Sequence, residues 1–163
     1  MRNLVKIIKF DEQELQSVYR LIQNTIDISY SKVYPQEVIR FFKEWHSKEH
    51  ILDDAIAGYT VVAKLDNEII GTGTLFGTNI RRVFIHPLHQ YMGTGKLIVR
   101  DLERRALIEK LTTVDLEASL VSRRFWESLG FVVQREDFIP VKNNKKLYFY
   151  RMTKDLLINR LQE

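Results

Sequence analysis

The spacing of apolar residues changes along the chain, and this change restricts the possible fold more than any other feature. Near the N-terminus the spacing is helical, as in Leu15, Val18 and Ile22. From Tyr59 onward apolar residues alternate with polar ones, a period of two that is typical of half-buried strands. One long helical segment, residues 93–110, then separates two strand-like segments. Such a chain is expected to form a sheet that carries helices.

Local patterns give the order of the elements. Strands are predicted over residues 3–10, 59–65, 68–76, 79–86, 113–119, 131–140 and 146–152. Helices are predicted over residues 11–28, from residue 35 onward, and over 93–110 and 120–129, with a weakly helical connector over 47–56 and a terminal helix over 154–161. Asp66-Asn67 and Asn143-Asn144 fit tight turns between strands. The order is therefore β-α-α-β-β-β-α-β-α-β-β.

This order specifies a fold class. A helix between two strands implies a parallel crossover, whereas strands joined by tight turns pair antiparallel. We therefore expect an α+β fold of mixed α/β character, with a mixed, mostly antiparallel sheet flanked by helices. No linker or repeat interrupts the 163 residues, so a single domain over residues 1–163 is expected.

The chain contains no cysteine, which excludes disulfides, cysteine-bound zinc, iron–sulfur clusters and thiol nucleophiles. Apolar runs are too short to cross a membrane, and the N-terminus lacks a secretory signal, so we expect a cytoplasmic protein without a membrane partner. The net charge of +4 leaves nucleic acid or a phosphorylated small molecule open as a partner.

The segment 83–96 carries the strongest chemical signal. A buried strand ends at Pro87, and a short loop then opens the long helix through Gly93 and Gly95. A helix N-terminus presents unpaired N–H groups, and glycine lets phosphates approach the backbone, so this loop could hold a diphosphate. The Walker A pattern fails because Gln90 and Leu97 stand at its required positions, and G-x-G-x-x-G also fails.

The loop instead reads Gln90-x-x-Gly93-x-Gly95, which resembles the coenzyme A pyrophosphate loop of the GNAT (Gcn5-related) N-acetyltransferases. A second motif, Phe125-Trp126-Glu127-Ser128-Leu129-Gly130-Phe131, is similar to the family's Phe-Tyr-x-x-x-Gly-Phe/Tyr. The order of elements also matches, over about residues 4–152. The resemblance implies a GNAT-like acyl-CoA N-acyltransferase fold and direct transfer of acetyl from acetyl-CoA to an amine, with no metal.

The resemblance also implies where acetyl-CoA binds. The strand over 82–86 would splay from the strand over 113–119, and the pantetheine arm would lie in the gap. Backbone groups of the first strand would pair with the arm, loop N–H groups would hold the diphosphate, and the helix after the second strand would flank the arm. The implied acetyl-CoA residues are Val83, Phe84, Ile85, Gln90, Tyr91, Met92, Gly93, Thr94, Gly95, Lys96, Ser122, Phe125 and Trp126.

Two catalytic residues are expected, one acid and one base. The family usually places at position 126 a tyrosine that protonates the leaving thiolate, but Trp126 stands there, and indole has no useful acidity. Tyr91, Tyr148 and Tyr150 are alternative donors, of which we assign Tyr150. Glu117 lies on the strand beside the expected arm, so it is the candidate general base.

Several alternatives stay open. Trp126 also fits a CoA-binding module with weak or no catalysis, whereas nucleic-acid binding lacks a recognisable motif. The acceptor is a small molecule or a protein amine, and a homodimer is possible. His46-Ser47-Lys48-Glu49-His50 spells a zinc motif, which we interpret as two solvent-facing histidines. The loop over 24–34, with Asp27, Tyr30 and Tyr34, could receive an amine but is interpreted as a polar surface loop.

Overall fold

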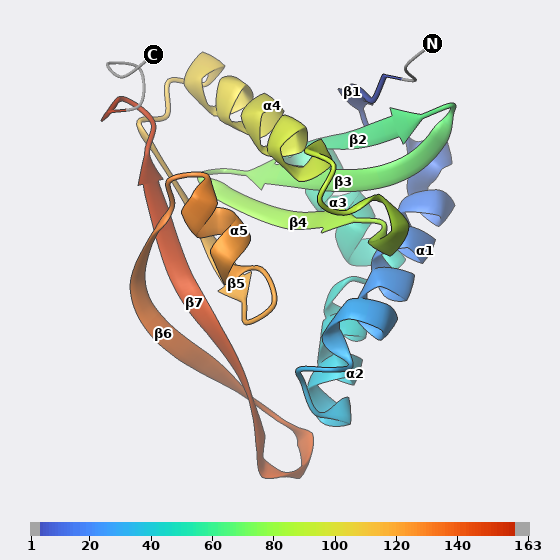
Figure 1. The fold of residues 1–163 in the computed structure, drawn as a ribbon, viewed down its shortest axis with the longest axis vertical. Coiled ribbons are helices and arrows are strands. Elements are labelled where there is room, and N and C mark those ends of the chain that lie inside the picture. Colours follow the sequence, from blue (N-terminus) through green and yellow to red (C-terminus); the bar gives the residue numbers. More distant parts are fainter. Residues whose placement is uncertain (1–3, 159–163) are drawn as a thin grey trace.

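Residues 4–158, described by a computed structural model, form one seven-stranded sheet with helices on both faces (Figure 1). The strand order is β1-β2-β3-β4-β5-β7-β6. Every neighbouring pair is antiparallel except β4 and β5, which are parallel and are joined through the crossover helix α4. The predicted fold class is therefore confirmed.

The elements have the following bounds. The strands are β1 (Lys6–Lys9), β2 (Tyr59–Leu65), β3 (Glu68–Phe76), β4 (Asn79–Ile85), β5 (Thr113–Ser119), β6 (Val132–Val141) and β7 (Lys145–Asp155). The α-helices are α1 (Leu15–Thr25), α2 (Gln36–Trp45), α3 (Lys48–Ala57), α4 (Thr94–Ile108) and α5 (Arg123–Ser128). The other helical segments are a π-helical turn (Ile26–Tyr30) and three 3-10 segments (Glu12–Glu14, Pro87–His89 and Lys142–Asn144) among the described residues.

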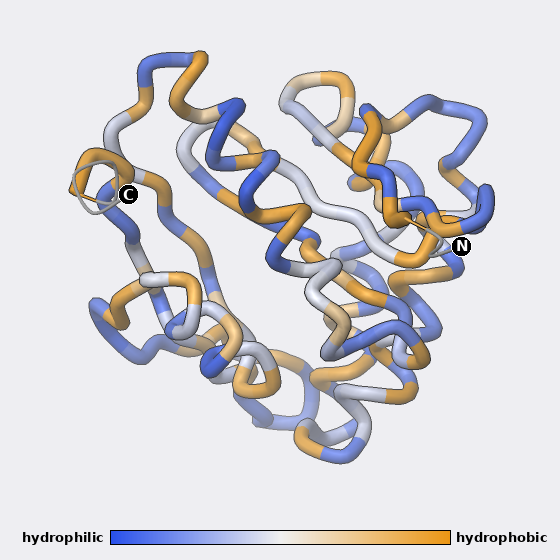
Figure 2. Tube along the Cα trace, turned by 45° about the horizontal axis from the view of Figure 1, so that its top comes forward, coloured by the Kyte–Doolittle hydropathy of each residue, from blue (hydrophilic) through white to orange (hydrophobic). Residues whose placement is uncertain are grey.

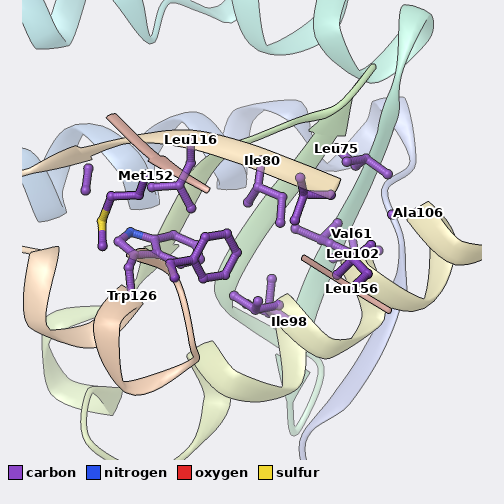
Figure 3. Packing of buried hydrophobic residues seen from close by; sticks show 14 of the residues in the cluster. Val61, Leu75, Ile80, Ile98, Leu102, Ala106, Leu116, Trp126, Met152 and Leu156 are labelled. Atoms are coloured by element: carbon purple, nitrogen blue, oxygen red, sulfur yellow. The ribbon is translucent and has the colours of Figure 1, made fainter. Parts of the chain in front are cut away.

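Two hydrophobic cores lie on opposite faces of the sheet, as the alternation within β2 requires. Val61 and Ala63 pack in the core beneath α4 and α5, whereas Val62 between them packs in the core beneath α1, α2 and α3. Figure 3 shows the first core, where Ile98 and Leu102 of α4 meet the sheet. The predicted strand is confirmed, but β2 is covered on both faces and is not half-buried as its period of two indicated.

The structure corrects three of the predicted elements. The connector 47–56 is a full helix, α3, whose N-cap Ser47 accepts a hydrogen bond from the backbone N–H of His50 (3.2 Å). The first helix runs on into the π-helical turn instead of ending in a polar surface loop. Lys154 and Asp155, predicted to begin a terminal helix, are the last residues of β7. Residue 3 of the predicted first strand and residues 159–161 of the predicted terminal helix lie outside the described residues.

A bulge in β4 lies opposite Gly73 of β3, where α4 packs closely on the sheet. Arg82 and Val83 together oppose the single residue Gly73 on β3, and Arg82 adopts a left-handed backbone conformation (φ 52°). A Cβ atom on Gly73 would lie 2.6 Å from Ile98 Cγ2, so glycine is required for α4 to pack this closely. The bulge and the glycine therefore lie together where α4 packs on β3 and β4.

High and low hydropathy alternate along the described trace (Figure 2) and are not gathered into one apolar segment. Among residues 4–158, no helix combines the length and the apolar character that crossing a membrane demands.

Candidate active site

The sheet splits between β4 and β5. The register contains one pair, Asn79 opposite Asp115, and the backbone N–H of Asp115 donates to the carbonyl of Thr78 (3.0 Å). Beyond this point β5 continues to pair with β7 over its whole length, while β4 stays with β3. In Figure 1, β2–β4 run across the upper half of the view and β5–β7 run down its left side. The expected splay of these two strands is therefore confirmed.

A pocket of about 360 Å³ occupies the split. Its walls come from β4, from the facing strands β5, β6 and β7, and from α2 and α5. Five of the predicted site residues line it: Val83, Phe84, Glu117, Ser122 and Trp126. The pocket therefore joins the two faces of the sheet at the place where the acyl chemistry was expected.

The glycine loop lies at the N-terminus of α4. Gly93 is the N-cap in a left-handed conformation (φ 86°), which glycine adopts without strain. The hydroxyl of Thr94 is buried and has no hydrogen-bond partner within residues 4–158. The first N–H groups of an α-helix have no partner within the helix. The first turn of α4 therefore offers an uncommitted hydroxyl beside uncommitted backbone donors.

The remaining loop residues have distinct environments. The Gln90 side-chain amide donates to the carbonyl of Ile85 (3.1 Å), which ties the loop back to the end of β4. Tyr91 is fully exposed in a left-handed conformation, and Met92 and Lys96 are also exposed. None of these residues, and neither Ile85, Thr94, Gly95 nor Phe125, lines the pocket.

Gly95 packs against Phe125 of α5. A Cβ atom at position 95 would lie 2.9 Å from Phe125 Cζ and 3.7 Å from Ile85 Cγ1. The absence of a side chain therefore brings the helix N-terminus, α5 and the end of β4 together.

Glu117 lies on the β5 wall of the pocket. One carboxylate oxygen accepts from the Asn79 side-chain amide (3.0 Å), and the other pairs with Arg151 on β7 (3.2 Å). The side chain is 44% exposed. Arg151 also pairs with Asp137 (3.2 Å), whose pKa is lowered by the hydrogen bond from the Phe138 backbone and by that arginine. Glu117 is thus a solvent-accessible carboxylate fixed by two donors.

Trp126 is 5% exposed and forms part of both the core and the pocket wall. Its ring contacts Phe125 and Phe131 edge-on, at 5.0 and 5.2 Å between ring centroids. Figure 3 shows its indole beside Leu116 and Met152. The hydroxyl oxygen of Ser122, one turn earlier, lies 2.9 Å from that of Ser119. The indole therefore fills a packed position next to the pocket.

The structure does not bring Tyr150 to the pocket. Its ring lies under the guanidinium of Arg123 (4.4 Å to the centroid) and packs with the core beneath α5. The neighbouring β7 residues Phe149 and Arg151 line the pocket instead, because successive side chains of a strand point to opposite faces.

Two tyrosines that we interpreted as surface residues are buried. Tyr30, from the π-helical turn, lines the pocket, and its phenol oxygen accepts from Ser119 Oγ (3.3 Å). Tyr34 accepts from the backbone N–H of Leu120 (2.7 Å). Burial raises the pKa of both phenols, so both remain protonated near neutral pH. The sequence did contain a signal, since Val18, Ile22, Ile26, Tyr30 and Tyr34 recur every four residues.

The two histidines of the zinc-like motif lie in different environments. His46, which ends α2, is buried, lines the pocket and packs edge-on against Phe84 (5.1 Å between centroids). His50 is exposed, and its Nδ1 lies 2.9 Å from the carbonyl of Trp45. The interpretation of both as solvent-facing is wrong for His46, because the chain turns at the end of α2 and directs this residue into the second core.

His46 is kept neutral by its surroundings. Burial, and then the charges of Arg82 and His50, lower its pKa to about 3. A histidine in an unfolded chain has a pKa near 6.5. As the pH falls below this value, the unfolded chain therefore binds a proton that the folded protein does not bind. The stability gained by keeping His46 neutral is therefore complete above pH 6.5 and is lost as the pH falls from there toward 3.

This difference predicts an acid-dependent loss of stability. Between pH 7 and pH 5 the free energy of unfolding should fall by about 2 kcal/mol through His46. Urea unfolding at both pH values would measure it for the wild type and for His46→Phe, which keeps an aromatic ring against Phe84. The variant should lose about 2 kcal/mol less over this interval, and equal pH dependence of the two proteins would contradict the assignment.

The split sheet, the pocket within the split and the glycine-opened N-terminus of α4 together define an acyltransferase architecture, and comparison with known proteins gives the family. A sequence profile described as an acetyltransferase (GNAT) domain matches residues 27–156. Because this match spans most of the chain, the protein belongs to the GNAT acetyltransferase family. No curated protein matches the chain by sequence.

Solved structures share the fold at low sequence identity. A GCN5-related N-acetyltransferase from Rhodopseudomonas palustris is 17% identical, with a TM-score of 0.86 over 95% of this chain and 98% of that one. PaiA N-acetyltransferase from Thermoplasma acidophilum, in complex with coenzyme A, is 17% identical (TM-score 0.74; 93% and 99% covered). YncA from Salmonella typhimurium, with its cofactor acetyl-CoA, is 16% identical (TM-score 0.65; 94% and 94% covered).

Proposed function

We propose that this acetyltransferase moves the acetyl group of acetyl-CoA directly onto a primary amine held in the pocket between β4 and β5. The observation that carries the proposal is the single β4–β5 pair at Asn79, after which the strands part around a 360 Å³ pocket. The pocket contains the carboxylate of Glu117, and α5, which lines it, packs through Phe125 against Gly95 in the first turn of α4. Family membership supports the same chemistry.

The free edge of β4 suits the pantetheine arm. The backbone N–H of His86 donates to Ile70 on β3 (2.8 Å). Adjacent residues of a strand direct their backbone groups to opposite sides, so those of Ile85 face the gap. An extended chain carrying amides can pair with such an edge as an added strand. We assign Val83 and Ile85 to this pairing and the N–H groups of residues 90–96 to the diphosphate.

The transfer removes two protons from the acceptor ammonium, one before attack and one as the amide forms, and supplies one proton to the leaving thiolate. Glu117 accepts a proton from the ammonium of the acceptor, directly or through water, and leaves a free amine. The amine nitrogen forms a bond to the thioester carbonyl carbon, the carbon–sulfur bond breaks, and the thiolate leaves. A backbone N–H of β4 stabilises the negative charge on the carbonyl oxygen during attack. We assign the protonation of the leaving sulfur to the phenol of Tyr30, which lines the pocket whereas Tyr150 does not.

The test has two stages. Titration with acetyl-CoA should give saturable binding, measured by calorimetry or by the melting temperature. Thiol release should then be measured with a panel of amines, each against a reaction without amine. No acetyl-CoA binding at millimolar concentration would overturn the proposal, and thiol release that no amine accelerates would leave only binding.

Trp126 favours a second candidate, a CoA-binding module with little catalysis. Trp126→Tyr should raise kcat up to about 10-fold with the best amine, because a phenol can protonate the thiolate and an indole cannot. The Kd for acetyl-CoA should change by less than about threefold, since affinity rests mainly on the loop and on β4. Kinetics of thiol release and calorimetry would measure the two quantities.

Trp126→Phe is the matched control, because it differs from Trp126→Tyr only by the hydroxyl, and it should give no increase in kcat. An inactive wild type beside an active Trp126→Tyr would favour the binding module. A fall in kcat in both variants would contradict the expected gain and would assign the indole itself to the reaction.

A further inference from the structure

The wall of the pocket formed by the β4 bulge and the end of α2 carries excess positive charge. Arg81 and Arg82 both pair with one carboxylate, Asp54 of α3. Arg81 donates in addition to the neutral side chain of Asn79 (2.8 Å). No other ion pair of either arginine occurs within residues 4–158. One positive charge therefore remains uncompensated at this wall.

The same wall contains two buried polar atoms without partners. The Arg82 side chain is only 4% exposed, and its Nε has no hydrogen-bond partner in the described chain. Its Nη2 makes one long contact, 3.4 Å, to the carbonyl of Trp45. Nδ1 of His46, which is 7% exposed, is likewise buried without a partner. Buried polar atoms in native proteins are nearly always hydrogen-bonded, so these two atoms, on residues that both line the pocket, require a partner that the described chain does not supply.

The opposite wall has a different charge arrangement. Glu117 and Asp137 share Arg151, and Arg135 reaches Asp137 from the rim (3.5 Å). Their charges balance, so the net positive charge is confined to the Arg82 wall. Phe42, Trp45 and Phe84 line the pocket on the side of that wall.

We propose that the acceptor is an amino carboxylic acid with an apolar body, whose carboxylate binds Arg82 and His46 while its amine faces Glu117. This inference rests on the proposed acetyl transfer and specifies its substrate class. A carboxylate matches one unpaired positive charge and accepts from both a guanidinium and an imidazole N–H. The neutral state of His46 suits this role, because the ring then needs no second counterion. Lysine side chains and N-termini of proteins are disfavoured as acceptors, because they carry no free carboxylate next to the reacting amine.

The binding test does not require turnover. N-acetyl-leucine, N-acetylmethionine and N-acetylphenylalanine are compared with their primary amides on the wild-type protein saturated with CoA. The Kd of at least one acid should be roughly 10- to 100-fold lower than that of its amide, as expected for a buried charged hydrogen bond. Thiol release with the corresponding free amino acids and amino amides should show the same preference in kcat/KM.

Variants then test the two residues. Arg82→Met should bind acid and amide alike, and His46→Phe, which preserves the packing on Phe84, should lower the preference for the acid. Arg104→Met removes an exposed arginine of α4 and should keep the wild-type preference. Melting curves and CoA affinity report whether each variant is folded, and His46→Phe provides the test if Arg82→Met does not fold.

The outcomes separate the two proposals. If the protein binds CoA but binds acids and amides equally well, or binds none of the three acids, the proposed substrate class alone is overturned. A preference that survives both Arg82→Met and His46→Phe would overturn the assigned wall. If the wild-type protein does not bind CoA, the proposed function and the substrate class that rests on it are both overturned.

Discussion

Gly95→Asp is expected to weaken acetyl-CoA binding about 1,000-fold. The new Cβ would lie 2.9 Å from Phe125 Cζ, so the contact between α4 and α5 must open. The carboxylate would also stand in the first turn of α4, where the uncommitted N–H groups are assigned to the diphosphate, and would repel it. Loss of two charge-assisted hydrogen bonds alone is worth about 4 kcal/mol, which corresponds to this factor. Calorimetry with acetyl-CoA would measure the change.

The substitution should leave a folded protein. An acidic residue in the first turn of a helix interacts favourably with the helix dipole, so α4 itself is not disfavoured. Gly77→Asp is the matched control, because it adds the same charge at a turn where a Cβ atom meets nothing within 4 Å. Its Kd should equal that of the wild type. A Gly95→Asp protein that melts like the wild type and binds acetyl-CoA within threefold of it would remove the loop from the binding site.

Glu117→Gln is expected to lower kcat about 100-fold without changing the affinity for acetyl-CoA. The amide keeps the shape of the side chain and can still contact Asn79, but it cannot take a proton from the acceptor ammonium. General base catalysis contributes about this factor or more. Because the variant depends on amine that is already deprotonated in solution, its kcat/KM should continue to rise with pH toward the pKa of the acceptor. Thiol release from pH 6 to pH 9 would measure both effects.

A surface ion pair of similar exposure provides the control for Glu117. Glu109 pairs with Arg105 at 2.9 Å and is 40% exposed, but it lies at the end of α4, outside the pocket. Glu109→Gln should leave kcat and its pH profile unchanged. If Glu117→Gln retained kcat within a factor of two, water alone would serve as the base.

Much of the fold could be predicted because local signals and tertiary structure agree. Asp66 and Asn67 both adopt left-handed conformations in the turn that their residue types favour. β2, β3 and β5 have the bounds that the alternation predicted. The loop could be recognised because both of its requirements are met by glycine, which is visible in a sequence: Gly93 needs a left-handed backbone, and Gly95 needs the absence of a side chain beside Phe125.

The acceptor side of the pocket could not be predicted in the same way. The apolar residues from Val18 to Tyr34 repeat every four positions, which drifts around an α-helix of 3.6 residues per turn. The π-helical turn absorbs this drift and brings Tyr30 inside. The burial of His46 depends on the turn between α2 and α3, and the orphaned Arg82 depends on a bulge. These are tertiary features, which no local pattern of residues records.

The split between β4 and β5 also creates two sheet edges in the interior of the protein. A free edge is a template onto which a strand of another chain can add, and natural proteins guard such edges with charges and bulges. Here the β4 edge carries a bulge with Arg82 at its centre, and the β5 edge carries Glu117. The bulge at Arg82 and the charge of Glu117 therefore make these two edges poor templates for a strand of another chain.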